Sequence, residues 1–170
     1  VPITRSKNDR RKDLIITYVD GEGKSGAQYA SLYADENRIS SDSVVAPSSF
    51  LKTFEAKVSE EGDVSAVIII DDLAATGRSL SANVASFVGE HAEVLKLTQV
   101  RIVTLVATEE ANQRLLRKLK KMEEIDIDFR TCEILPQDHY ALPNDKSGFA
   151  SKDQWDRAQA LFTDLGSRID

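Results

Sequence analysis

The stretch that decides the fold of this chain is AVIIIDDLAATGRSL, residues 66–80. Its first five residues are apolar and do not alternate with polar ones, which predicts a central strand that is covered on both faces. Two carboxylates, Asp71 and Asp72, end this strand. A loop of small residues then leads into a helix that we expect over residues 78–88. A strand that feeds directly into a helix is typical of α/β proteins with parallel strands.

The same alternation of strand and helix extends to both sides of this stretch. Short runs of apolar, mostly β-branched residues predict further strands at 14–19, at 100–107 and within 125–135. Apolar residues at helical spacing predict helices over 26–37, after Pro47, after Thr108 and after Ser151. We therefore expect a three-layer α/β fold, with a mostly parallel sheet and helices on both faces.

Length and charge bound the organisation of the chain. It has 170 residues, which predicts one domain. We expect a basic arm at 1–13, an α/β core at 14–135, and a hood loop with a C-terminal helix at 136–170. The first residue is Val1 and not Met, which suggests a piece cut from a longer polypeptide. The net charge of −6 argues against nucleic-acid binding by this domain alone, and the sequence offers no run long enough to span a membrane.

The single cysteine, Cys132, excludes an internal disulfide and a cysteine-based zinc site. Such sparse cysteine usage fits a reducing compartment, and we expect a cytoplasmic protein. Cys132 falls within a predicted strand, where we expect a packed thiol. His91 stands in a polar stretch, where we expect a solvated side chain.

The exit of the 66–70 strand carries groups that suit a ribose 5-phosphate. A helix start offers unpaired amides to a phosphate. Gly77 lets the backbone approach that phosphate, and Thr76 and Ser79 add hydroxyl donors. The carboxylates of Asp71 and Asp72 can accept hydrogen bonds from vicinal hydroxyls. In the alternative interpretation, the acids are polar turn residues and a hydroxyl merely caps the helix.

This string closely resembles the phosphoribosyl diphosphate (PRPP) motif of type I phosphoribosyltransferases: hydrophobic residues, two acids, then Thr-Gly-x-Thr/Ser. The resemblance implies that Asp71 and Asp72 hold the ribose hydroxyls. It also implies that the 5-phosphate is held by a loop made of Ala75, Thr76, Gly77, Arg78 and Ser79. One departure is Ala75, which stands where the 6-oxopurine members of the family carry an Asp. An alanine cannot transfer a proton, so chemistry on that kind of base is not expected here.

The exit of the first strand reads VDGEGKSG, residues 19–26, and suits a second anionic group. In the resemblance this is the diphosphate loop, where Lys24 neutralises charge and the amides of Gly23, Ser25 and Gly26 donate hydrogen bonds. Alternatively it is a glycine-rich turn with an exposed lysine. A degenerate P-loop NTPase is a third possibility, but the position of its first glycine is held by Tyr18, inside the strand.

The resemblance implies a transferase that uses Mg²⁺ and PRPP and releases diphosphate as a nitrogenous acceptor receives ribose 5-phosphate. Asp71, Asp72 and Lys24 would be its catalytic residues, with Mg²⁺ held near the two acids mainly through PRPP oxygens. The acceptor, a base or nucleotide, is not named by the sequence, although Tyr140 is placed to stack on it. The segment at residues 18–37 looks like a branch of the family found in bacterial conflict and defence operons.

A different class of function stays open beside this one. The chain could be a non-catalytic module that senses PRPP or a nucleotide inside a larger assembly, acting with a partner protein or as a homodimer. An enzyme consumes PRPP and releases diphosphate, whereas a sensor is only stabilised by the ligand.

Overall fold

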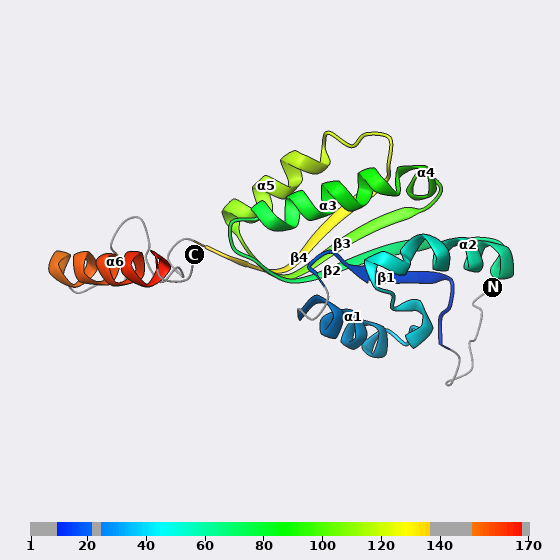
Figure 1. The fold of residues 1–170 in the computed structure, drawn as a ribbon, viewed down its shortest axis with the longest axis horizontal. Coiled ribbons are helices and arrows are strands. Elements are labelled where there is room, and N and C mark those ends of the chain that lie inside the picture. Colours follow the sequence, from blue (N-terminus) through cyan, green and yellow to red (C-terminus); the bar gives the residue numbers. More distant parts are fainter. Residues whose placement is uncertain (1–9, 22–24, 137–150, 168–170) are drawn as a thin grey trace. The chain divides into compact units, whose positions relative to one another are not determined.

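The structure of the protein is a computed structural model, in which residues 10–21, 25–136 and 151–167 are described. The chain divides into two compact units, residues Val1–Ile134 and Leu135–Asp170. The first unit holds the sheet and the helices packed on it (Figure 1). This confirms the α/β class that the alternating apolar runs predict.

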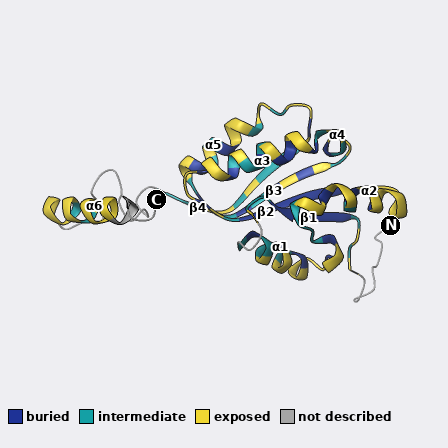
Figure 2. Cartoon of the chain, viewed as in Figure 1, coloured by how far each residue is buried: buried dark blue, intermediate teal, exposed yellow. Residues whose placement is uncertain are grey.

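The sheet has four strands in the order β1-β2-β3-β4. Their bounds are Leu14–Tyr18 for β1, Ala66–Ala74 for β2, Gln99–Thr108 for β3 and Ile127–Leu135 for β4. β1 pairs with β2 in parallel, and β2 pairs with β3 in parallel. All of β1 and the first six residues of β2 are buried, as Figure 2 shows in dark blue. Their unbroken apolar runs are what a strand covered on both faces requires.

Helices cover both faces of the sheet (Figure 1). On one face lies α1 (Ser25–Glu36), which buries Ala30 and Ala34 against the side chains of Ile16 and Ile68. The other face carries α2 (Phe50–Glu61), α3 (Arg78–Glu90), α4 (Ala92–Leu95) and α5 (Glu109–Leu119). Because consecutive strand residues point to opposite faces, β2 supplies both apolar cores.

Two short 3₁₀ segments, Ser41–Ser43 and Pro47–Ser49, connect α1 to α2. Between them the chain runs beside the free side of β1, where Val45 N donates to Ile16 O at 2.9 Å. Thr17 Oγ1 donates to Val45 O at 3.0 Å on the same side. The chain thus runs along one side of β1 first, and then crosses to form β2 on the other side of β1. Such a change of direction leaves a crevice at the carboxyl ends of the strands, and ligands bind there in open α/β sheets.

Two side chains differ from their predicted settings. His91 is 8% exposed instead of solvated, and its ring centroid lies 4.8 Å from those of both Phe50 and Phe87. Burial lowers the pKa of His91, which favours the neutral ring, although the charge of Glu90 opposes this. Cys132 is exposed and not packed. The reason is that β4 lies at the edge of the described sheet, where its side chains are less covered than those of a central strand.

The second unit contains α6 (Lys152–Ser167). Ser151 Oγ accepts a hydrogen bond from Gln154 N at 3.2 Å, which is the helix-capping contact that the Ser-x-x-Gln spacing predicts. An ion pair between Arg157 and Asp153, with an N–O distance of 2.9 Å, lies one turn further along the helix. Among the helices in the described ranges, none is both long enough and apolar enough to cross a membrane.

Candidate functional site

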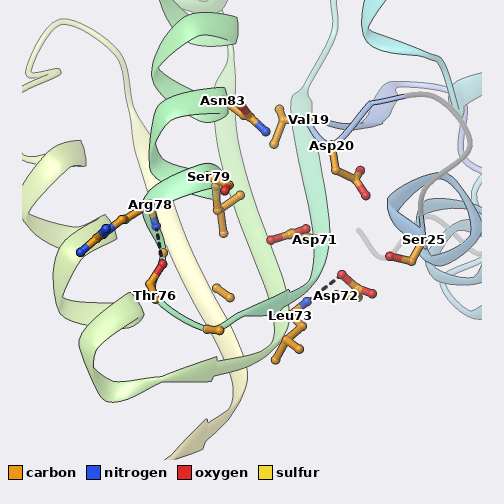
Figure 3. A pocket seen from close by; sticks show the side chains of 14 residues that line it. Val19, Asp20, Ser25, Asp71, Asp72, Leu73, Thr76, Arg78, Ser79 and Asn83 are labelled. Carbon is orange, nitrogen blue, oxygen red and sulfur yellow. Dashed lines mark hydrogen bonds between the residues drawn. The ribbon is translucent and has the colours of Figure 1, made fainter. Parts of the chain in front are cut away.

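A cavity of about 320 Å³ opens at the carboxyl ends of β1 and β2, beside the start of α3 (Figure 3). Its walls come from three segments that are distant in the sequence: the exit of β1, the exit of β2 with the loop that follows, and the first turns of α3. Both candidate ligand loops predicted from the sequence follow these same strand exits. The chain geometry and the sequence motifs therefore point to one place.

Asp71 and Asp72 line this cavity from opposite faces of the sheet. Both belong to β2, so their side chains alternate: Asp71 points toward α3, whereas Asp72 points toward Ser25 at the start of α1 (Figure 3). Asp72 Oδ1 accepts a hydrogen bond from Leu73 N at 2.8 Å. Asp71 is only 7% exposed. The pair can therefore contact two sides of a bound molecule.

The charge of Asp71 is disfavoured in the folded protein. Burial raises its pKa to about 6, and the nearby charges of Asp72 and Asp20 add to this effect. Hydroxyl donors and cations both stabilise the ionised form of a carboxyl group. A ligand that offers either of them to Asp71 would therefore bind favourably. A strongly shifted acid in a cavity is a physical mark of a functional site.

The loop between β2 and α3 has the backbone shape of an anion cradle. Gly77 precedes α3 with a φ of 67°, a left-handed conformation that favours glycine. A Cβ at this position would lie 2.9 Å from the Cα of Ala111, so a larger residue does not fit. Gly77 has no side chain with which to cap α3, and only the first amide of the helix, Arg78 N, is bound by the neighbouring Thr76 side chain. The amides that follow in the first turn have no partner within the helix and suit an anion.

Contacts from outside the motif hold this loop in place. The Thr108 hydroxyl donates to the carbonyl oxygen of Ala75, and Thr108 Oγ1 itself accepts from Ala111 N at 3.1 Å. Thr76 Oγ1 accepts from Arg78 N at 3.4 Å. The position of the loop thus depends on the junction of β3 and α5, where Thr108 also caps the helix as its sequence position predicts.

The exit of β1 contributes Asp20 and Ser25 to the cavity. Asp20 Oδ2 accepts a hydrogen bond from Gly26 N at 3.1 Å, across the loop that joins β1 to α1. Of the predicted diphosphate loop, Gly23 and Lys24 lie outside the described residues. Tyr140, the predicted stacking partner for a base, also lies outside them.

The structure brings most of the remaining predicted residues together. Ser25 lies on one side of the cavity, and Asp71, Asp72 and the 75–79 loop lie on the other. Sequence reasoning missed Asp20, Asn83 and the support from Thr108. The sequence does hold a signal for Asp20, because this acid closely follows the apolar run of β1, as Asp71 follows the apolar run at the start of β2. Asn83 lies one turn into α3, beyond the reach of the motif.

The donor set of the cavity suits a hard divalent cation such as Mg²⁺, which prefers carboxylate, phosphate and water oxygens. Within the described ranges, no three acidic, histidine or cysteine side chains are arranged to hold a metal ion by themselves. The carboxylates would therefore need oxygen atoms from a bound ligand to complete a coordination shell.

The fold and the site define the class of this protein as phosphoribosyltransferase-like. It has a parallel α/β sheet, an acid pair within the last residues of a buried strand, which runs on to Ala74 and does not end at the acids as the sequence suggests, and a small loop that leads into a helix. The family model described as PRTase-CE matches residues 2–170. The chain therefore belongs to the PRTase-CE family, a family of phosphoribosyltransferase type. No curated protein matches the sequence.

Proposed function

We propose that this protein binds Mg²⁺–PRPP and transfers ribose 5-phosphate to a nitrogenous acceptor, with release of diphosphate. The observation that supports this most directly is the shared cavity. The two carboxylates near the carboxyl end of β2 and the α3 N-terminus behind Gly77 line the same space. A molecule with vicinal hydroxyls at one end and a phosphate at the other fits this pairing of acceptors and donors.

Each part of the site has a role in this reaction. The carboxylates of Asp71 and Asp72 accept hydrogen bonds from the ribose hydroxyls. The amides that follow Gly77, with the hydroxyls of Thr76 and Ser79, bind the 5-phosphate. Ribose is then fixed at both ends, which orients its C1 carbon toward the acceptor, and positioning of this kind supplies much of the rate enhancement in group transfer.

The bond changes follow from this arrangement. The acceptor nitrogen forms a bond to C1 while the bond from C1 to the diphosphate oxygen breaks, and the electron pair leaves with diphosphate. Ser25 and Lys24, on the β1 side, are the residues that we assign to the leaving diphosphate. When bound, Mg²⁺ would supply positive charge at the same oxygen atoms. Ala75 provides no base, so the acceptor proton is lost to another group.

Calorimetry and a product assay test this function together. We expect PRPP to bind in the presence of Mg²⁺, and a panel of nitrogenous bases to give diphosphate release. Loss of one charge-assisted contact costs about 1.5–3 kcal/mol, roughly 10–150-fold in binding. The double substitution Asp71→Asn/Asp72→Asn should therefore abolish turnover, whereas Asp63→Asn, a change at an exposed acid outside the cavity, should have no effect. Unchanged turnover in the double variant would refute the proposal.

Ala75 favours one second candidate, a module that senses PRPP or a nucleotide without catalysis. A sensor keeps the ribose and phosphate contacts but has no need for a proton-transferring group beside the base. In this case Mg²⁺–PRPP raises the melting temperature while no base in the panel gives diphosphate release. Release with any base excludes the sensor.

A further inference from the structure

A second cavity, of about 340 Å³, opens at the other end of the strands from the acid-lined cavity. Leu14, Ala66 and Gln99, which begin β1, β2 and β3, line it, so it lies at the amino ends of these strands. Tyr33, in the last turn of α1, forms part of the wall. Among the described lining residues, none is shared between the two cavities. The second cavity is therefore a separate space.

The charged side chains in this wall are all of one sign. Arg11 and Arg101 belong to it, and no aspartate or glutamate is among the described residues that line it. The cavity at the carboxyl ends of the strands is the opposite, because three carboxylates line it. In a chain with a net charge of −6, two guanidinium groups in a cavity whose described lining has no acid favour a negatively charged ligand.

Asp13 holds Arg11 in place without using all of its donors. Arg11 Nε donates to Asp13 Oδ1 at 3.0 Å, and Arg11 Nη2 donates to Asp13 Oδ2 at 2.6 Å. Ser65 Oγ donates to the same carboxylate at 2.7 Å. Among the described residues, Arg11 Nη1 has no hydrogen-bond partner. The guanidinium is thus fixed before any ligand binds, which lowers the entropy that binding would cost.

Arg101 supplies positive charge that no carboxylate offsets. In the β2–β3 register it lies beside Ile68, whose side chain belongs to the apolar cluster that packs against α1. Arg101 therefore lies on the α1 face of the sheet. Its Nη2 donates to Gln99 Oε1 at 3.4 Å, and within the described ranges it forms no ion pair. Its remaining N–H groups are available to a ligand.

The floor of the cavity is apolar. Leu14 and Ile68 line it and are buried, and Tyr33 adds an aromatic ring that is half-buried. We propose that this cavity is a second binding site, for a small organic anion. Arg11 and Arg101 bind its phosphate or carboxylate group, because a guanidinium offers paired N–H donors to either oxyanion. Its apolar body contacts the aromatic ring and the strand residues.

The test is an NMR titration of the whole isotope-labelled chain with phenyl phosphate, benzoate and benzyl alcohol. These probes share one aromatic ring and differ in charge. We expect the backbone amide signals of residues 33–37 and 99–101 to shift saturably with an anion and not with benzyl alcohol. A response to phenyl phosphate alone assigns a phosphate ligand, a response to benzoate alone assigns a carboxylate, and a response to both assigns either oxyanion. Signals of residues 75–79 report separately on the predicted phosphate loop.

Arg101→Gln should weaken binding of the anion by about tenfold or more, because one charge-assisted contact is lost. The matched control is Arg130→Gln, which removes an exposed arginine from β4 that does not line the cavity. The control should keep the affinity of the unsubstituted protein. Equal losses in the two variants would show an effect of net charge alone and would overturn the inference.

Two results of the titration also overturn it: no saturable shift at residues 33–37 and 99–101 with either anion, or equal shifts with benzyl alcohol. The inference is independent of the proposed function, because the two cavities have no described lining residue in common. If the proposed function fails, Mg²⁺–PRPP gives neither binding nor product, but the anions still shift these signals and Arg101→Gln still weakens their binding.

Discussion

The hydroxyl of Thr108 donates to the carbonyl oxygen of Ala75, and this bond joins the end of β3 to the loop that we assign to the 5-phosphate. The oxygen of the same hydroxyl accepts from Ala111 N and so caps α5. Ala111 in turn is the residue against which Gly77 packs. One side chain therefore sets the start of α5 and the position of the phosphate loop together.

Replacing Thr108 with Val should weaken both functions of this side chain. The shape is kept but both hydrogen bonds are lost, and loss of a helix cap costs about 1 kcal/mol of stability. We expect urea denaturation to show this loss, and PRPP affinity in calorimetry to fall about tenfold because the loop is no longer held. Thr108→Ser keeps the hydroxyl and should retain affinity. Equal affinity in the Val and Ser variants would contradict the role of Thr108.

Gly77→Ala should damage the loop directly. The left-handed backbone costs a residue with a side chain about 1–2 kcal/mol, and the added carbon would press against Ala111. We expect a lower midpoint in urea and loss of PRPP binding. Gly89→Ala is the matched control, because Gly89 lies in α3 with nothing within 4 Å of the added carbon. That change should stabilise the protein by roughly 0.5–1 kcal/mol. If both variants were more stable than the unsubstituted protein, the argument for Gly77 would be refuted.

Two buried threonines offer a comparison inside the sheet. Thr17 and Thr104 are both fully buried. Thr17 Oγ1 donates to Val45 O, whereas Thr104 Oγ1 has no hydrogen-bond partner in the described part of the chain. An unsatisfied buried hydroxyl costs about 1–3 kcal/mol. Thr104→Val should therefore raise the unfolding free energy by about 1 kcal/mol, and Thr17→Val should lower it by a similar amount. Destabilisation by Thr104→Val would indicate a bond that the structure lacks.

Much of the fold follows from the sequence because its central strands are simple. The run at residues 66–70 has no polar residue, so only a strand covered on both faces accommodates it. The cap of α5 at Thr108 is likewise predictable from one residue type in one position. β4 and His91 are harder, because their burial depends on which helices pack beside them. A one-dimensional pattern carries no information about those neighbours.

The site shows the same division. The 71–79 motif lies in one continuous segment, so its parts can be assigned from the order of the residues alone. Two residues outside this segment also act on it. Asp20 lies 51 positions before Asp71, and Thr108 lies 29 positions after Ser79. Their proximity is a product of the parallel strand order, which places all carboxyl ends at one edge. Residue spacing alone cannot supply it.

Asp71 should reduce the stability of the protein at neutral pH. Its pKa is about 6 in the folded state and 3.8 as the ordinary value. Between these two pH values the folded protein binds more protons than the unfolded chain, so stability falls as the pH rises through this window. Above about pH 6 the folded state carries the whole cost of an ionised, buried carboxylate. Asp71→Asn removes that cost and keeps the shape of the side chain.

Urea denaturation at about pH 7.5 and about pH 4 measures this effect. At the higher pH, Asp71→Asn should be more stable than the unsubstituted protein by on the order of 1 kcal/mol, a value reduced by water in the open cavity. The difference should nearly vanish at the lower pH, where Asp71 is protonated in the folded state. Asp63→Asn, at an exposed position, should show no such pH dependence. A stabilisation by Asp71→Asn that is equal at both pH values would show that packing, and not charge, is responsible. The same variant should lose PRPP binding. Asp71 would then be a residue that binds the ligand and lowers the stability of the folded protein.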